Sequence, residues 1–183
     1  LSHMDEKKIN NTNNLLLEVL LAAKYEGQLL VKNHEEYKKT NNDSNICTVL
    51  ARSFADIGDI VRGKDLFIGY NQKDRNEKKQ LQQNLKNIFK EIHNGLDGEA
   101  QARYNGDTDN YYKLREDWWA LNRDQVWKAI TCDAKEEDTY SKSPEHGTTG
   151  VSHGRCGHED QDVQTYLDYV PQYLRWFEEW AED

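Results

Sequence analysis

Apolar residues at helical spacing, almost uninterrupted by proline, limit most strongly what this chain can fold into. The 183 residues contain only two prolines, and proline breaks helices because it lacks an amide hydrogen and clashes with the preceding turn. Within residues 74–93, apolar side chains recur every three or four positions, at Leu81, Leu85, Ile88, Phe89 and Ile92. This spacing is typical of an amphipathic helix with one buried face. The sequence therefore predicts an all-α protein.

The same pattern extends over most of the chain and predicts an irregular bundle of about five helices. Turn-forming residues separate the apolar stretches, and we expect helices over residues 12–39, 46–63, 74–93, 109–131 and 171–183, with a short helix at 97–104. Residues 133–162 are rich in Asp, Glu, Gly, Ser, Thr and His and nearly lack apolar side chains. Because such a segment has little apolar surface to bury, we predict a long flexible loop before the last helix.

The first residues and the hydropathy of the chain indicate a piece of a longer protein. Residues 1–4, Leu-Ser-His-Met, are typical of the vector scar that tag removal leaves, so we place a single helical domain at residues 5–183. No apolar run reaches the roughly 20 residues that cross a bilayer, and no signal peptide follows residue 4. We therefore expect the location of the protein to be set by parts of its parent outside this chain.

Charge and motif content argue against nucleic-acid binding and catalysis. With 24 basic and 33 acidic residues, the chain carries a formal charge of −9, whereas phosphate contacts need a clustered basic surface. The sequence contains no phosphate-binding glycine loop, serine nucleophile motif or zinc-protease helix motif. We predict no nucleic-acid partner, no cofactor and no enzymatic activity.

The chemistry of the three cysteines stays open when only the residues are considered. An odd number suggests a free thiol or a partner outside the chain; the three are Cys47, Cys132 and Cys156. A zinc site is one alternative to a disulfide, although the spacing fits no standard zinc pattern; its ligands would be His153, Cys156 and His158 with Cys132 or His146. A catalytic Cys–His pair would need a base held within hydrogen-bond reach, and these histidines fall in the predicted loop. We predict no metal site and no catalytic residue.

Large aromatic residues are the candidate core. Each tryptophan can bury about 150–250 Å², which suits either a core or an anchor for a partner. In the last predicted helix, Tyr173, Trp176, Phe177 and Trp180 recur at i, i+3, i+4 and i+7. This spacing favours a structural role, and the predicted core residues are Trp118, Trp119, Trp127, Trp176, Phe177 and Trp180.

Charged residues stand beside these apolar faces. They are Asp56, Asp59, Arg62, Arg115, Arg123 and Arg175. A charge within an apolar stripe must find a partner or face water. We therefore predict buried ion pairs that fix the register of the helices, in preference to a contact surface.

Three runs of sequence resemble the Duffy-binding-like (DBL) domains of malaria-parasite adhesins. They are Ile-Cys-Thr-Val-Leu-Ala-Arg-Ser-Phe-Ala-Asp-Ile-Gly-Asp-Ile-Val-Arg-Gly-Lys-Asp-Leu-Phe at residues 46–67, Arg-Glu-Asp-Trp-Trp at 115–119, and Pro-Gln-Tyr-Leu-Arg-Trp-Phe-Glu-Glu-Trp-Ala-Glu-Asp at 171–183. The similarity is closest to the alpha type, and it extends to residues 22–27 and 122–132. It covers nearly the whole chain and corresponds to the second of the three subdomains of a DBL domain.

The resemblance implies a role in cell adhesion. It implies a fragment of a host-receptor-binding adhesin at the extracellular face of the infected red-cell membrane, acting in cytoadhesion, rosetting and antigenic variation. Neighbouring DBL subdomains are implied partners, and a structural scaffold that presents variable epitopes without a receptor site of its own is the alternative.

The resemblance also assigns the cysteines. It implies a disulfide between Cys47 and Cys156, and a mate for Cys132 that lies outside this chain. Alpha-type members often have a cysteine at the position of Leu20, so the bridge that such a cysteine forms is absent here.

The candidate contact surface is the polar face of the predicted helix at residues 74–93. It carries Lys73, Arg75, Lys78, Lys79, Lys86 and Lys90. Because alpha-type members are associated with heparan sulfate, an anionic glycan of that kind is the expected ligand. Glu77 and Glu91 interleave with the basic residues, and an ordinary solvated helix face is the alternative.

Overall fold

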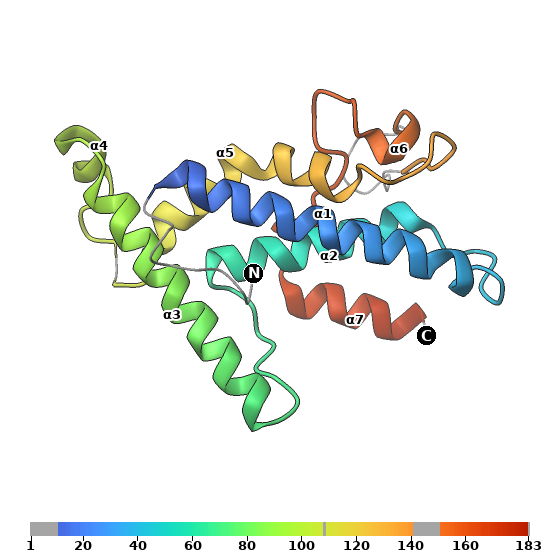
Figure 1. Cartoon of the computed structure of the whole chain (residues 1–183), viewed down its shortest axis with the longest axis horizontal. Helices are drawn as coiled ribbons and strands as arrows, with labels where there is room; N and C mark the ends of the chain where they lie inside the picture. The colour runs from blue at the N-terminus through green and yellow to red at the C-terminus, as the bar shows by residue number, and fades with distance from the viewer. Residues whose placement is uncertain (1–10, 108, 141–150, 183) are drawn as a thin grey trace. The chain divides into compact units, whose positions relative to one another are not determined.

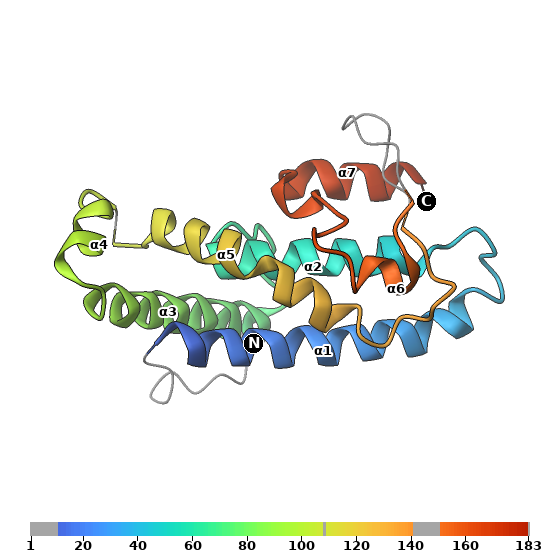
Figure 2. The ribbon, with the colours of Figure 1, turned by 90° about the horizontal axis from the view of Figure 1, so that it is seen from above.

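The computed structural model describes residues 11–107, 109–140 and 151–182, and over these residues it confirms the all-α prediction. The helices are shown in chain order, from blue to red, in Figure 1 and Figure 2. They are α1 (Thr12–Tyr37), α2 (Ile46–Arg62), α3 (Gln72–Asn94), α4 (Gly98–Arg103), α5 (Tyr112–Ile130), α6 (Gly154–Gly157) and α7 (Gln172–Glu182), with a 3-10 turn at Leu167–Tyr169. Within these described ranges, no helix is both long enough and apolar enough to cross a membrane.

Polar side chains at the helix ends explain where α3 and α4 begin. The side chain of Asn71 accepts a hydrogen bond from the amide of Asp74 at 2.9 Å, and the side chain of Asp97 accepts one from the amide of Ala100 at 2.8 Å. Each bond satisfies an amide that lacks a partner within the helix. Gly95 ends α3, and its amide donates to the carbonyl of Glu91 at 3.0 Å.

The described residues group into two compact units. Of the described residues, unit 1 contains those up to Val19 and those within Gly58–Asn122, and unit 2 contains those within Leu20–Ile57 and those from Arg123 onward. Three helices, α1, α2 and α5, contribute residues to both units. The boundaries therefore fall within helices rather than in linkers, and composition gives no sign of them.

The core of unit 1 forms around α3 and two tryptophans of α5. The five apolar residues predicted to face inward from α3 are all buried, and Trp118 and Trp119 are 4% and 0% exposed. Trp118 meets Phe89 edge to face, with ring centroids 6.1 Å apart. A Cβ atom on Gly58 would lie 2.7 Å from the indole of Trp119. Glycine at this position of α2 therefore leaves the space that the indole fills.

Two buried arginines complete unit 1. Arg62 donates to Asp59 at 3.0 Å and to the carbonyl of Gly58 at 3.0 Å. Arg115 donates to the carbonyls of Val61 at 2.7 Å and Ile60 at 3.3 Å, where α2 ends. Burial lowers the pKa of Arg115 to about 10, so its side chain still carries a charge at neutral pH. Arg62 and Asp59 thus form a buried ion pair, the kind of contact predicted for this set of charged residues without its partners.

Unit 2 is organised around Trp127, which is 1% exposed. Phe54 meets Trp127 edge to face at 5.3 Å between ring centroids. A Cβ atom on Gly27 would lie 2.9 Å from the carbonyl carbon of Ile130, which places the backbones of α1 and α5 in close contact within this unit.

Ion pairs tie the C-terminal part of unit 2 to its other helices, and one of them joins Arg52 of α2 to Glu179 of α7 at 3.4 Å. Arg123 of α5 donates to both oxygens of Asp168, at 2.7 and 2.8 Å, and the Asp168 side chain is fully buried. Arg175 of α7 donates to Asp56 of α2 at 2.8 Å. The Arg175 side chain is 2% exposed but the Asp56 side chain is 49% exposed, so this ion pair is only half buried, in contrast to the predicted buried pairs.

A disulfide joins α2 to α6 in unit 2. Cys47 and Cys156 are bonded at an S–S distance of 2.03 Å across 109 residues of sequence, as the family resemblance implies. Cys132 is free. Burial is the main cause that raises the pKa of the Cys132 thiol, and a hydrogen bond to Asp133 adds to it, so the thiol is protonated at neutral pH.

The described flanks of the predicted loop at 133–162 are held by hydrogen bonds. The amide of Tyr140 donates to the side-chain oxygen of Ser152 at 2.8 Å, and the amide of Ser152 donates to the carbonyl of Tyr140 at 3.0 Å. The amide of Cys156 donates to the carbonyl of Asp138 at 2.8 Å. Residues 141–150, on which the rest of the loop prediction falls, lie outside the described residues.

Helix α7 presents its aromatic face differently from the prediction. Phe177 and Trp180 are 68% and 74% exposed, so neither belongs to the core of this chain, and Trp176 is half-buried. The buried residues of α7 are instead Gln172 and Arg175. Helical spacing shows that one face of α7 is apolar, but it does not show that another part of this chain covers that face. In this structure, the ion pair of Arg175 with Asp56 decides which side of α7 faces α2.

Candidate functional site

Four of the six predicted basic residues line one hollow of unit 1, with a volume of about 670 Å³. We call it the cationic hollow. Its basic residues are Arg75, Lys78, Lys79 and Lys86, and its other lining residues are Asp65, Phe67, Ile68, Gln82, Gln83 and Asn110. Lys73 and Lys90 do not line it. The prediction of a shared basic surface on this helix therefore applies to part of the residue set only.

Helical spacing places the basic side chains on one face of α3. Counted from Arg75, the lining residues of this helix follow at three, four, seven, eight and eleven positions, which lie close together on a helix surface. The core residues of α3, from Leu81 to Ile92, occupy the other face. The helix is thereby held in unit 1 by its apolar side while its basic side stays available.

The segment that connects α2 to α3 forms the opposite wall. It turns back at Gly69, whose φ of +104° favours glycine, and a Cβ atom there would lie 2.8 Å from the amide nitrogen of Arg75. Phe67 packs edge to face on Tyr70 at 4.9 Å between centroids. This turn brings Phe67 and Ile68 to the edge of the cationic hollow.

The cationic hollow has a local excess of positive charge. Its four basic side chains and one acidic side chain leave a net charge of +3, in a chain whose overall charge is −9. Lys78 forms an ion pair with Asp65, whose side chain is 6% exposed. Among the residues that the structure describes, Arg75, Lys79 and Lys86 have no ion-pair partner.

The two remaining basic residues of the predicted set occupy other surroundings. Lys73 is 83% exposed at its side chain and lies 3.9 Å from Glu77, one turn further along α3. Lys90 is exposed near the end of the helix. Both are exposed on α3 outside the cationic hollow.

Sequence reasoning missed the non-basic residues of the cationic hollow. Phe67 and Ile68 belong to the apolar run Leu66–Ile68 between Asp65 and Gly69, and this was a usable signal. No local signal indicates Asn110, because only the tertiary fold brings it to the hollow. The carbonyl of Asn110 accepts from Arg115 at 3.4 Å, which holds the backbone there.

The arrangement suits recognition of an anionic ligand. Arginine and lysine side chains donate charge-assisted hydrogen bonds to sulfate and carboxylate groups. Amide side chains such as Gln83 can donate to and accept from hydroxyl groups. Phe67 is 39% exposed and Ile68 is 68% exposed, so the rim also offers apolar surface to the hydrocarbon face of a ligand.

The zinc alternative does not fit the cysteine chemistry. Cys156 is bonded to Cys47 and so is not available as a thiolate ligand. Across residues 11–107, 109–140 and 151–182, no group of three or more His, Cys, Asp or Glu side chains is placed to hold a metal ion. His146, a proposed fourth ligand, lies outside the described residues.

Solved structures and a curated relative resemble this chain. The NTS-DBL1 (alpha-1) domain of Plasmodium falciparum membrane protein 1 (PfEMP1) from the varO strain is 48% identical over 99% of this chain and 40% of that chain, with a TM-score of 0.84. A PfEMP1 DBLβ domain bound to human ICAM-1 is 36% identical over 92% of this chain and 32% of that chain, with a TM-score of 0.69. The Duffy receptor gamma form of Plasmodium knowlesi is 29% identical over 149 residues, which is 80% of this chain and 10% of the receptor.

The family assignment rests on nearly the whole chain, although each relative is longer. This chain spans less than half the length of the proteins just compared. The Duffy binding domain family matches residues 1–175. The family consists of receptor-binding domains rather than enzymes. The chain belongs to the Duffy binding domain family.

Proposed function

We propose that this chain is a host-receptor-binding part of a PfEMP1-type adhesin and that its cationic hollow binds an anionic, heparan sulfate-like glycan. The single observation that carries the proposal is the convergence of Arg75, Lys79 and Lys86, none with a described ion-pair partner, in one hollow with a net charge of +3. The parent would act in cytoadhesion or rosetting at the extracellular face of the infected red-cell membrane.

Local charge supports this proposal despite the acidic chain. Exposed charges more than about 10 Å apart are screened at 0.1 M ionic strength, so a ligand in the hollow responds mainly to the lining residues. A sulfated glycan repeats its charges along the chain and can contact several basic side chains at once. Binding of this kind weakens as salt is added, because counterions are released on association.

Heparin binding tests the proposal with two variants of equal charge. In the first, Lys79→Glu and Lys86→Glu reverse two charges of the cationic hollow. In the matched control, Lys73→Glu and Lys90→Glu reverse two charges of the same helix outside the hollow. Lys78 is left unchanged because it pairs with the buried Asp65. We expect the first variant to lose heparin-column retention and the control to keep most of it.

The salt dependence of heparin binding gives a second readout. The slope of log affinity against log salt should fall by roughly one for each lysine that no longer pairs with a sulfate group, hence by about two in the first variant. Equal reductions in the two variants would show diffuse attraction to α3 rather than a site. Elution of the unmodified chain at low salt would reject the glycan proposal.

A structural scaffold is the second candidate function, and the aromatic face of α7 favours it. Tyr173, Phe177 and Trp180 are 60%, 68% and 74% exposed, and a large exposed apolar patch usually marks an interaction surface. In this proposal, a neighbouring DBL subdomain of the parent covers the face, and the chain presents variable epitopes without a receptor site of its own.

Substitution of the exposed aromatic residues shows whether a neighbouring subdomain covers this face of α7 or whether the face stays exposed to solvent. Phe177→Ser with Trp180→Ser should leave the stability of this chain nearly unchanged, since both side chains already face solvent. In a longer protein that contains the neighbouring subdomains, the same changes should lower the unfolding temperature. Unchanged stability in the longer protein would remove the support for a scaffold role.

A further inference from the structure

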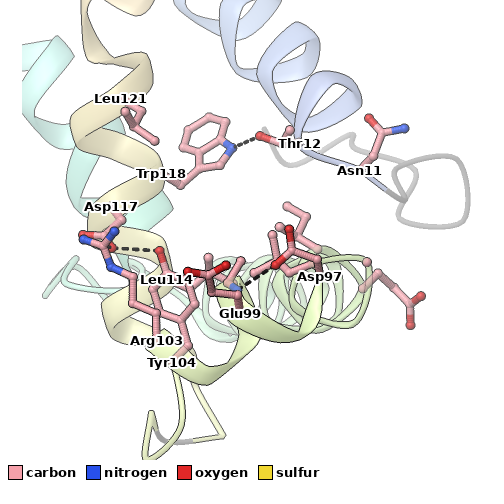
Figure 3. A pocket seen from close by; sticks show the side chains of 15 residues that line it. Asn11, Thr12, Asp97, Glu99, Arg103, Tyr104, Leu114, Asp117, Trp118 and Leu121 are labelled. Atoms are coloured by element: carbon pink, nitrogen blue, oxygen red, sulfur yellow. Dashed lines mark hydrogen bonds and ion pairs between the residues drawn. The ribbon is translucent and has the colours of Figure 1, made fainter.

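A second hollow of unit 1 has the opposite charge character and shares no lining residue with the cationic hollow. Its volume is about 740 Å³, within the range of about 300–1,000 Å³ that is typical of ligand sites. The ends of α3 and α1 meet α4 and α5 around it, as Figure 3 shows. We call it the acidic pocket.

The floor of the acidic pocket is apolar and comes mainly from α5. Leu114, Trp118 and Leu121 recur at i, i+4 and i+7, so they form one stripe along this helix. Leu114 and Trp118 are 5% and 4% exposed, whereas Leu121 is 78% exposed. Ile92 and Leu96, near the end of α3, extend the apolar surface. A ligand that lay against Leu121 would cover a side chain that water now surrounds.

The rim of the acidic pocket is negatively charged. It carries Glu91, Asp97, Glu99 and Asp117 against the single basic Arg103, which leaves a net charge of −3. In Figure 3, Asp97 and Glu99 lie on one side of the pocket, and Trp118 lies on the other with Thr12. Acidic side chains around an apolar floor match a ligand that combines positive charge with apolar groups.

Two of the rim carboxylates are available for such a ligand. Glu91 and Glu99 are exposed, and within the described part of the chain neither forms an ion pair. The other two are already engaged. Asp97 accepts from the amide of Ala100 at 2.8 Å, and Asp117 accepts from the Tyr104 hydroxyl at 2.8 Å.

The pocket walls are fixed by hydrogen bonds before any ligand binds. The indole nitrogen of Trp118 donates to the Thr12 hydroxyl at 2.8 Å, which ties α5 to the start of α1 (Figure 3). Burial raises the pKa of Tyr104, and the bond to Asp117 adds to this. The Tyr104 hydroxyl therefore keeps its proton and continues to hold α4 against α5. A preformed pocket binds more tightly because binding then restricts less conformational freedom.

We propose that the acidic pocket binds a basic, leucine-containing peptide segment of a partner protein, with lysine or arginine side chains at Glu91 and Glu99 and apolar side chains on Trp118 and Leu121. Charge complementarity selects this occupant, because the −3 rim opposes an acidic segment and the apolar floor gives no advantage to a purely charged one. The acidic pocket and the cationic hollow share no lining residue, so the peptide proposal and the glycan proposal can each be rejected without the other.

Three end-capped hexapeptides provide the probes for a calorimetric titration of the full chain. Lys-Leu-Lys-Leu-Lys-Leu carries both features, Lys-Ser-Lys-Ser-Lys-Ser carries the charge alone, and Glu-Leu-Glu-Leu-Glu-Leu carries the apolar groups with the wrong charge. We expect the first to bind and the other two to bind at least about tenfold more weakly, as a requirement for both features implies. The charge-only peptide measures diffuse attraction to the acidic chain.

Variants at exposed positions locate the binding. Glu91→Gln with Glu99→Gln should weaken the binding of Lys-Leu-Lys-Leu-Lys-Leu by about two- to thirtyfold, the range for the loss of two exposed ionic contacts. Leu121→Ser should also weaken the binding of this peptide. The matched controls are Glu77→Gln with Asp109→Asn, which remove the same charge outside the pocket, and Leu21→Ser on α1, where the leucine is 54% exposed. Both controls should bind like the unmodified chain.

Several results would overturn the proposal. The acidic pocket is not the site if the glutamine double variant binds the first peptide as tightly as the unmodified chain. Equal binding of the acidic peptide would remove the role of charge, and equal binding of the serine-containing peptide would remove the role of the apolar floor. Absence of binding at millimolar concentrations of the first peptide would also reject it.

Discussion

Replacement of Gly58 tests how closely α2 and α5 pack within unit 1. A Cβ atom at this position would lie 2.7 and 2.8 Å from two indole carbons of Trp119, and 3.3 Å from a guanidinium nitrogen of Arg62. Ordinary contacts begin near 3.4 Å, so the indole or the helix would have to move by about 0.7 Å (3.4 − 2.7). Trp119 is fully buried, and tightly packed interiors leave little room for such a movement.

The magnitude follows from two opposing effects. Alanine stabilises a helix by about 1 kcal/mol relative to glycine, whereas overpacking of a core costs about 1–3 kcal/mol. We therefore expect Gly58→Ala to lower the free energy of unfolding by up to about 2 kcal/mol. Leucine has nearly the same helix propensity as alanine but carries three more carbons. We therefore expect Gly58→Leu to lower the free energy of unfolding by about 3 kcal/mol.

Urea denaturation followed by far-UV circular dichroism measures these changes. Gly98→Ala and Gly98→Leu are the matched controls, because a Cβ atom on Gly98 of α4 meets nothing within 4 Å, and both should be close to neutral. In a Trp119→Phe background the two indole carbons are absent, so Gly58→Ala should cost less, with a coupling of about 0.5–3 kcal/mol. Unchanged stability of Gly58→Leu would refute the close packing described here.

Three further perturbations have expected outcomes. Replacement of Cys47 and Cys156 by serine should lower stability by about 4–5 kcal/mol in the chain-entropy treatment, given their separation of 109 residues, and chemical denaturation with and without reductant measures it. Burial raises the pKa of Tyr140 above its ordinary value of 10.0. The tyrosine of the unfolded chain therefore ionises first, and the free energy of unfolding should fall as the pH rises above 10.0. Tyr140→Phe should reduce the slope of the free energy of unfolding against pH, measured by denaturation at alkaline pH. Arg123→Met should cost about 3–5 kcal/mol because it removes the ion pair between Arg123 and the buried Asp168 carboxylate. Adding Asp168→Leu should recover part of the loss in thermal denaturation.

Local sequence signals were sufficient for the longer helices and insufficient for α6, which falls within the predicted loop, and for the contacts between helices. The periodicity of α3 and the capping residue Asn71 define that helix without reference to the rest of the chain. The short α6 is different, because Arg155 and Cys156 adopt φ values of 57°, which non-glycine residues rarely adopt. Only tertiary bonds, including the disulfide, explain such a conformation.

The candidate site shows the same limit. Helical spacing identified the basic face of α3, but the segment at residues 64–71 decides which of those residues share a hollow. That path depends on the turn at Gly69 and on the pairing of Lys78 with Asp65. Likewise, burial logic predicted that Arg123 needs a partner, but not that the partner is Asp168, 45 residues further along the chain.

The two hydrogen bonds between Tyr140 and Ser152 have a consequence for how this chain can diverge. The two residues are 12 positions apart, and they exchange hydrogen bonds at 2.8 and 3.0 Å. Because the closure entropy of a chain segment grows only slowly with its length, insertion between these two positions carries a small thermodynamic penalty. The anchors would stay where they are while the intervening residues changed. The number of residues between Tyr140 and Ser152 can thus change while the helical framework is preserved.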